Sequence, residues 1–111
     1  MIPFLDLKAI NLAHESELKA AFERVLHSGW YILGQEVKDF EAAFASYCNT
    51  THAIGVSNGL DALHLILRAY DIGAGDEVIV PANTYIATWL AVTQAGAIPI
   101  PVEPVESTYN L

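Results

Sequence analysis

Val-Ser-Asn-Gly-Leu-Asp-Ala-Leu, at residues 56–63, is the stretch from which we predict the fold. Residues 52–57 are a short apolar run typical of a strand, and residues 58–72 have the all-round hydrophobicity of a buried helix. A strand that passes through a polar, glycine-containing turn directly into a helix is one unit of an α/β fold. We therefore expect this turn at the carboxyl end of a strand, where open α/β sheets bind their ligands.

The same alternation continues toward the carboxyl end. A β-branched run at 77–81 predicts a second strand, residues 84–95 predict a helix that ends at Gly96, and residues 97–102 predict a third strand. Short connections between such elements imply right-handed crossovers and a mainly parallel sheet. The two prolines of the third strand remove donors from the ladder, so this strand suits an edge position.

Two amphipathic helices precede this region. Apolar residues recur at three- and four-residue steps through 11–27 and again through 35–47, as one buried stripe requires. Between them lies an aromatic loop bounded by glycines, which adopt backbone angles that other residues avoid. We expect one α/β domain. The first helix and the aromatic loop occupy residues 1–34, and residues 35–111 form the start of the α/β region.

The overall composition excludes several classes of protein. The 111 residues carry a formal charge of −8, and their five Lys and Arg residues are scattered. Binding to nucleic acid or to an anionic membrane needs clustered basic residues, so we expect neither partner. We expect the single cysteine, Cys48, to be a small buried residue of a soluble, cytoplasmic protein. The four histidines lack the spacing of metal ligands, so we expect no metal site.

The turn at 57–61 has the chemistry of an anion site. The first amides of a helix lack intrahelical partners, and Gly59 would let a phosphate group approach the backbone. Ser57 could add a donor, whereas the Asp61 carboxylate would repel phosphate unless its side chain turns away. Alternatively, Ser57 or Asn58 only caps the helix and Gly59 only fits the turn. The residues leave both possibilities open.

Tyr85 follows the second predicted strand, at the start of the next predicted helix. Its ring could stack on a planar cofactor. Trp89 lies four residues later, so the two rings could instead pack together on one helix face. The spacing alone does not decide between these two roles.

Six motifs, in order and with matching gaps, resemble the beginning of the DegT/DnrJ/EryC1/StrS aminotransferases, and together they cover essentially the whole chain. The resemblance implies the amino-terminal part of the large domain of the pyridoxal-phosphate-dependent aspartate-aminotransferase type, fold type I. It also implies transfer of an amino group, usually from glutamate, to a keto group of a nucleotide-linked sugar by a homodimer. The motifs are residues 29–34, 37–41, 52–63, 75–81, 84–88 and 96–97.

The resemblance also implies a site for pyridoxal 5'-phosphate. Tyr85 occupies the position whose ring stacks on the pyridine, and Trp30 and Tyr31 lie in the loop near the substrate and the dimer interface. Leu60 replaces a common threonine, so one hydroxyl contact is lost while the amide contact can remain. The residues expected around the phosphate group are Ser57, Asn58, Gly59, Leu60 and Asp61.

The residues at 58–63, 102–104 and 108–111 most resemble members that aminate a 3-keto group of a dTDP-linked 6-deoxyhexose. The family's Schiff-base lysine has no counterpart, because every lysine of this chain precedes or lies on the first two predicted helices. We therefore expect a truncated chain that contains no catalytic residue and is inactive alone. Its open sheet edge should favour aggregation.

Two alternatives follow from the residues without the resemblance. The chain could be a stand-alone phosphate- or nucleotide-binding module, or a non-catalytic interaction protein of the α/β class. The sequence does not identify the sugar, and it does not separate a transaminase from a related dehydratase.

Overall fold

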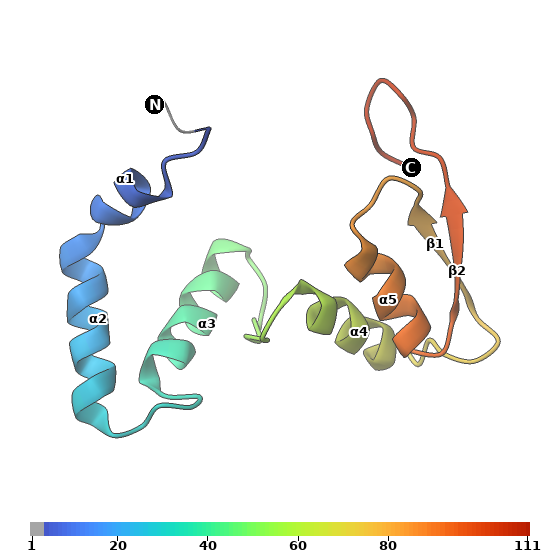
Figure 1. The fold of residues 1–111 in the computed structure, drawn as a ribbon. Coiled ribbons are helices and arrows are strands. Elements are labelled where there is room, and N and C mark those ends of the chain that lie inside the picture. The colour runs from blue at the N-terminus through green and yellow to red at the C-terminus, as the bar shows by residue number, and fades with distance from the viewer. Residues whose placement is uncertain (1–3) are drawn as a thin grey trace. The chain divides into compact units, whose positions relative to one another are not determined.

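A computed structural model describes residues 4–111, in which five helices and two strands form (Figure 1). The chain divides into two compact units, Met1–Gly55 and Val56–Leu111. The boundary that the sequence predicts after residue 34 falls inside the first unit. No helix within residues 4–111 is both long and apolar enough to cross a membrane. The elements are α1 (Leu7–Leu12), α2 (Glu15–Ser28), α3 (Gln35–Tyr47), α4 (Gly59–Ala69), β1 (Glu77–Pro81), α5 (Ile86–Gln94) and β2 (Ile98–Val102).

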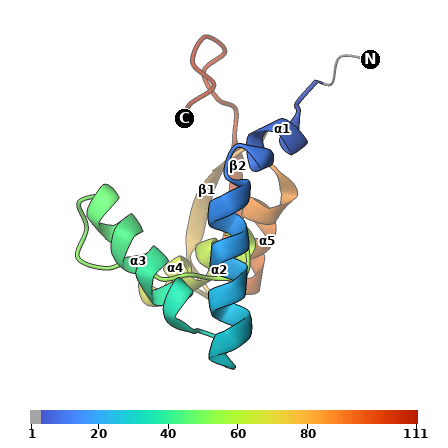
Figure 2. The same ribbon diagram turned by 90° about the vertical axis from the view of Figure 1, so that its left-hand side faces the viewer.

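The first unit is helical. Figures 1 and 2 show α2 and α3 joined by a loop into a helical hairpin, with α1 preceding α2. The helix expected through 11–27 is interrupted. α1 ends at Leu12 and α2 begins at Glu15, so Ala13 and His14 lie between two helices. Glu15 and Glu17 lie in the first turn of α2, where carboxylates stabilise the positive end of a helix and favour a start at this point.

The strand expected at 52–57 does not form, and that prediction is wrong for this chain. A strand exists only through its ladder to a neighbour, and no strand of the described residues pairs with this segment. Its hydrogen bonding goes elsewhere: the Gly55 amide donates to the Glu41 carboxylate of α3 at 2.7 Å.

The second unit contains a two-stranded parallel sheet covered by α5, with α4 packed against α5. β1 occupies the range that the sequence predicts, and β2 pairs with it from Ile98 opposite Glu77 to Val102 opposite Pro81. Gly96 ends the α5 region with a φ of 89°, which confirms the predicted stop. The core is formed by Val80, Val92 and Ala97, with Leu67, Ile72, Val78 and Trp89 packed against them.

The prolines of β2 lie on its outer edge. The Ile98 amide donates to the carbonyl of Asp76, which precedes β1, so the alternation of a parallel strand turns 98, 100 and 102 toward β1. Pro99 and Pro101 therefore occupy the outward positions, where their missing amides cost no ladder bond. Both strands of this two-stranded sheet are edge strands, so the edge position predicted from the two prolines stays a prediction for a larger sheet.

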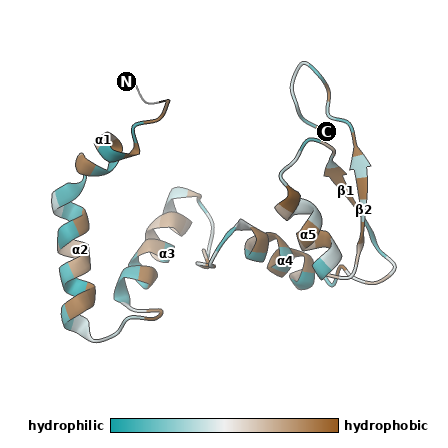
Figure 3. Ribbon diagram, viewed as in Figure 1, coloured by the Kyte–Doolittle hydropathy of each residue, from teal (hydrophilic) through white to brown (hydrophobic). Residues whose placement is uncertain are grey.

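Burial is the property for which the sequence-based predictions fail. The helix predicted at 58–72 forms as α4, yet it holds no fully buried residue, and Leu65 and Ile66 are each more than 50% exposed. Figure 3 shows the hydrophobic residues that α4 and α5 carry. Within the described residues α4 packs mainly against α5, with Leu67 reaching the core, so much of its surface stays open. Cys48, predicted to be buried, is exposed at the end of α3.

Candidate functional site

The turn at 57–61 is held together by its own side chains. Asn58 is the N-cap of α4, and its side-chain oxygen accepts from the Asp61 amide at 2.9 Å. The Ser57 hydroxyl donates to the Asp61 carboxylate, and the Asn58 side-chain amide donates to the same oxygen at 3.0 Å. The Asp61 side chain therefore turns back onto the two residues before the helix, which answers the question that the sequence left open about its direction.

These contacts decide which donors remain for a ligand. The Asn58 cap uses the Asp61 amide, and the Ser57 hydroxyl is engaged by the Asp61 carboxylate. The amides of Gly59 and Leu60 begin the helix and have no intrahelical acceptor. An anion at this turn would therefore have these two backbone amides as donors, and the cap at Asn58 would not compete with it.

Gly59 is not required by the protein's own structure. It lacks the positive φ of Gly29, Gly75 and Gly96, so its backbone angles suit other residues. A Cβ placed on Gly59 would meet no atom within 4 Å. The space above this backbone is open, which fits the approach of a phosphate group such as that of pyridoxal phosphate.

An open, mainly apolar groove of about 800 Å³ joins this turn to the start of α5. Tyr85, the N-cap residue of α5, lies in its lining and is 80% exposed, whereas Trp89 packs against the core. The two rings thus do not share one buried face. The lining residues are Asn58, Gly59, Leu60, Ala62, Leu63, Tyr85, Ile86, Ala87, Thr88 and Leu90.

The structure therefore brings four of the predicted site residues to one groove: Asn58, Gly59, Leu60 and Tyr85. Ser57 and Asp61 do not line it, and they act on the turn behind it. Thr88, which is not among the site residues predicted from the sequence, also lines the groove, and its hydroxyl bonds that of Thr84 at 2.9 Å. The four-residue spacing of these two threonines across a helix start was the available signal.

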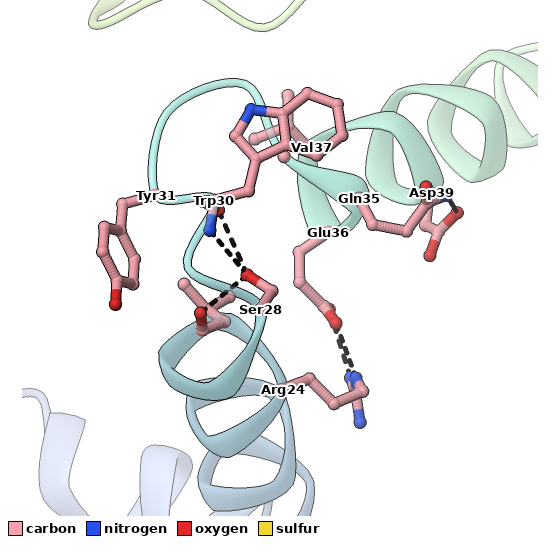
Figure 4. Close-up of a pocket in the computed structure, with 10 residues that line it drawn as sticks. Arg24, Ser28, Trp30, Tyr31, Gln35, Glu36, Val37 and Asp39 are labelled. Atoms are coloured by element: carbon pink, nitrogen blue, oxygen red, sulfur yellow. Dashed lines mark hydrogen bonds and ion pairs between the residues drawn. The ribbon is translucent and has the colours of Figure 1, made fainter.

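The aromatic loop of the first unit is a separate, tightly closed structure. The Ser28 hydroxyl donates to the Val25 carbonyl at 2.8 Å and accepts from the Trp30 amide at 3.0 Å. Lys38 lies 4.4 Å from the centre of the Trp30 ring, close enough for a cation–π contact. Figure 4 shows the Trp30 ring over the start of α3 and the Tyr31 ring on the other side of the loop.

An ion pair ties the two helices that flank this loop. Arg24 of α2 donates to both carboxylate oxygens of Glu36 in α3, at 2.6 and 3.1 Å (Figure 4). The hydrogen bond from Arg24, and then its charge, lower the pKa of Glu36, and the same bond raises the pKa of Arg24. Twelve residues separate the partners, so no local pattern in the sequence indicates the pair. Beside it lies a small pocket of about 190 Å³ that Trp30 and Tyr31 help to line.

Comparison with known proteins shows that both units of the chain match one family. Residues 13–111 match the DegT/DnrJ/EryC1/StrS aminotransferase family. The chain is 64% identical, over its whole length, to a dTDP-3-amino-3,6-dideoxy-alpha-D-galactopyranose transaminase of Aneurinibacillus thermoaerophilus, and covers 31% of that protein. It is 60% identical, over 95% of its length, to a dTDP-3-amino-3,4,6-trideoxy-alpha-D-glucose transaminase of Streptomyces venezuelae, and covers 28% of it.

Solved structures agree. DesV of S. venezuelae superposes with a TM-score of 0.93 at 58% identity, over 97% of this chain and 29% of that one. The sugar aminotransferase Spr1654 of Streptococcus pneumoniae, described as the PLP form, superposes with a TM-score of 0.79 at 37% identity, over 86% of this chain and 24% of that one. The chain thus spans about 30% of the length of the relatives that it matches.

Proposed function

Since the chain belongs to the DegT/DnrJ/EryC1/StrS aminotransferase family, we propose that it contributes part of the cofactor site of a pyridoxal-phosphate-dependent sugar aminotransferase. Its fold is the amino-terminal part of the fold type I large domain. The observation that carries the proposal is that Gly59 and Leu60, whose backbone amides lack intrahelical acceptors, line one groove together with Tyr85.

Each part of this groove suits one part of the cofactor. The amides of Gly59 and Leu60 would bind the phosphate group, and Gly59 presents no side chain to keep it away. Tyr85 would contact the planar ring. Asp61, by engaging Ser57, would keep its carboxylate turned toward the residues before the helix. Bound pyridoxal phosphate supplies an electron sink that allows an amino group to pass from donor to acceptor.

Leu60 adds an apolar side chain to the groove lining. In the resemblance that the motifs carry, threonine is common at this position, and its hydroxyl would contact the phosphate group. With leucine, this residue would bind phosphate through its backbone amide alone. We infer that binding of the phosphate group depends more on backbone geometry in this chain than in relatives with threonine.

The chain's lysines do not suit the Schiff base of this reaction. Lys19 pairs with Glu15 at 2.6 Å on the exposed face of α2, and Lys38 lies over the Trp30 ring. Lys8 is an exposed residue of α1. We place the reactive lysine in the part of the relatives' length that this chain does not span.

For the substrate, we propose a 3-keto group of a dTDP-linked 6-deoxyhexose, with glutamate as the amino donor. Two relatives, at 64% and 60% identity, are both named as transaminases of dTDP-3-amino sugars, which supports this choice. We further propose that Trp30 and Tyr31 lie near substrate and the partner subunit of a cytoplasmic homodimer. The closed loop that carries them supports this role, because a fixed loop can present its exposed Tyr31 ring in one position.

A chimera tests the proposal. Residues 1–111 replace the matching segment of the A. thermoaerophilus transaminase, which supplies the remainder of the fold. We expect this chimera to bind pyridoxal phosphate, seen by its visible absorbance, and to aminate the dTDP-3-keto sugar with glutamate. The matched control is the A. thermoaerophilus protein carrying its own segment. A chimera that folds like this control but binds no cofactor would refute the proposal.

A further inference from the structure

Two threonines bracket Tyr85 and bond to each other. Thr84 precedes the N-cap of α5 and Thr88 lies in the first turn of the helix. Their hydroxyl oxygens are 2.9 Å apart. Both residues are half-buried, so water competes less for this bond than for one on an open surface. The bond therefore links residues on either side of Tyr85 and closes a short loop of the chain that contains it.

This bond occurs where a helix cap is missing. Ser, Thr, Asp and Asn are the residues that usually cap a helix start with a side-chain oxygen, as Asn58 does for α4. Tyr85 stands at the N-cap of α5 and makes no such bond. The Thr84–Thr88 bond links the residue before the N-cap to the first turn of α5. It therefore restrains the start of the helix as a capping bond would, although the N-cap residue takes no part in it.

The backbone around Tyr85 is restrained on both sides. The Thr84 amide donates to the Pro81 carbonyl at 3.3 Å, and the Thr88 amide donates to the Tyr85 carbonyl at 3.0 Å. Tyr85 is 80% exposed, so packing on its ring contributes little to its placement. The position from which the ring leaves the backbone is therefore set mainly by its two threonine neighbours.

We propose that Thr84 and Thr88 are positioning residues that hold Tyr85 at the edge of the groove, ready to contact the planar ring of the cofactor. The inference rests on the proposed function of the groove as a pyridoxal-phosphate site. Thr88 lines the same groove as Gly59, Leu60 and Tyr85, so the bond lies beside the surface that it would organise.

The test compares cofactor affinity among variants of the chimera. Thr88→Val keeps the shape of the side chain but removes the hydroxyl, and we expect affinity for pyridoxal phosphate to fall about two- to tenfold, as for one lost neutral hydrogen bond. Thr88→Ser retains the hydroxyl and should restore most of the affinity. Thr93→Val is the matched control, because Thr93 does not line the groove and its hydroxyl donates to carbonyls within α5, those of Trp89 and Leu90, and affinity should not change.

A second background shows whether the threonines act through Tyr85. In a Tyr85→Ala chimera, Thr88→Val should cause no further loss, because two residues that act as one unit are not additive. An equal loss in both backgrounds, or an equal loss for Thr88→Ser, would overturn the positioning role while leaving the proposed function intact. Failure of the parent chimera to bind cofactor, by contrast, would overturn both.

Discussion

Gly34 in the aromatic loop and Gly59 at the start of α4 differ in whether the chain's own structure requires a glycine. A Cβ on Gly34 would lie 2.8 Å from the carbonyl oxygen of Trp30, a distance that real Cβ atoms do not reach. A Cβ on Gly59 would meet nothing within 4 Å. Gly34 is therefore demanded by the closure of its own loop, whereas Gly59 leaves backbone open to something outside the chain. The comparison teaches that a glycine without an internal structural requirement is a pointer to a ligand.

The largest expected effect comes from Gly59→Val in the chimera. The branched side chain should keep the phosphate group from the amides of Gly59 and Leu60, each worth about 1.5–3 kcal/mol when bonded to a charged group. Affinity for pyridoxal phosphate, measured by titration, should fall about a hundredfold or more. The thermal unfolding midpoint of the cofactor-free protein should change little, because the space is open. Unchanged affinity would remove Gly59 from the site.

Gly34→Ala should show the opposite pattern. The new methyl group must displace the Trp30 carbonyl, and forced overpacking of this kind costs about 1–3 kcal/mol. Urea unfolding of the cofactor-free chimera should record this loss in the free energy of unfolding. Gly59→Ala serves as the matched control and should lose less. If both variants unfold alike, the contrast between the two glycines is wrong.

The smallest effect concerns acid and the Arg24–Glu36 pair. The hydrogen bond from Arg24 lowers the pKa of Glu36 in the folded state, so its stabilisation is complete above the pKa of an unfolded glutamate. It should disappear as the pH falls through the lower, folded pKa. Glu36→Gln cannot ionise, so the stability difference between parent and variant should shrink over that pH range.

The Arg24–Glu36 difference should be small at every pH and smaller in high salt, because the Arg24 side chain is 60% exposed and that of Glu36 is 35% exposed. Urea unfolding at a series of pH values measures it. A difference that does not vary with pH would show that the two residues contribute by packing alone. The groove of the second unit provides an internal reference, since cofactor affinity should not follow this titration.

Several predictions from the sequence succeeded because their causes are local. The β-branched run of β1 formed a strand over its expected range, and Gly96 stopped the α5 region. The turn at 57–61 opened a helix, with Asn58 as its cap. The stop at Gly96 and the cap at Asn58 follow from backbone angles or hydrogen bonds among residues close together in the chain, whereas β1 also needed its ladder to the later strand β2.

Predictions that depended on distant neighbours were less successful. The segment at 52–57 has the composition of a strand but no partner to pair with in the described residues. The apolar α4 and Cys48 are exposed, because burial is a property of what covers a residue. Composition predicts that these residues are suited to burial, and it says nothing about whether a neighbour is present.

By itself the sequence determined that a polar, glycine-containing turn precedes a helix and that an aromatic residue begins the next helix, since caps, glycines and periodicity act within a few residues. Only the tertiary structure decided that Gly59, Leu60 and Tyr85 share one groove, that Asp61 turns toward Ser57, and that Thr84 bonds Thr88. The groove arises from the packing of α4 on α5, which joins residues that are distant in the chain. The Asp61–Ser57 and Thr84–Thr88 bonds join residues four apart, and for these the spacing permits the bond but does not select the side-chain rotamers that make it.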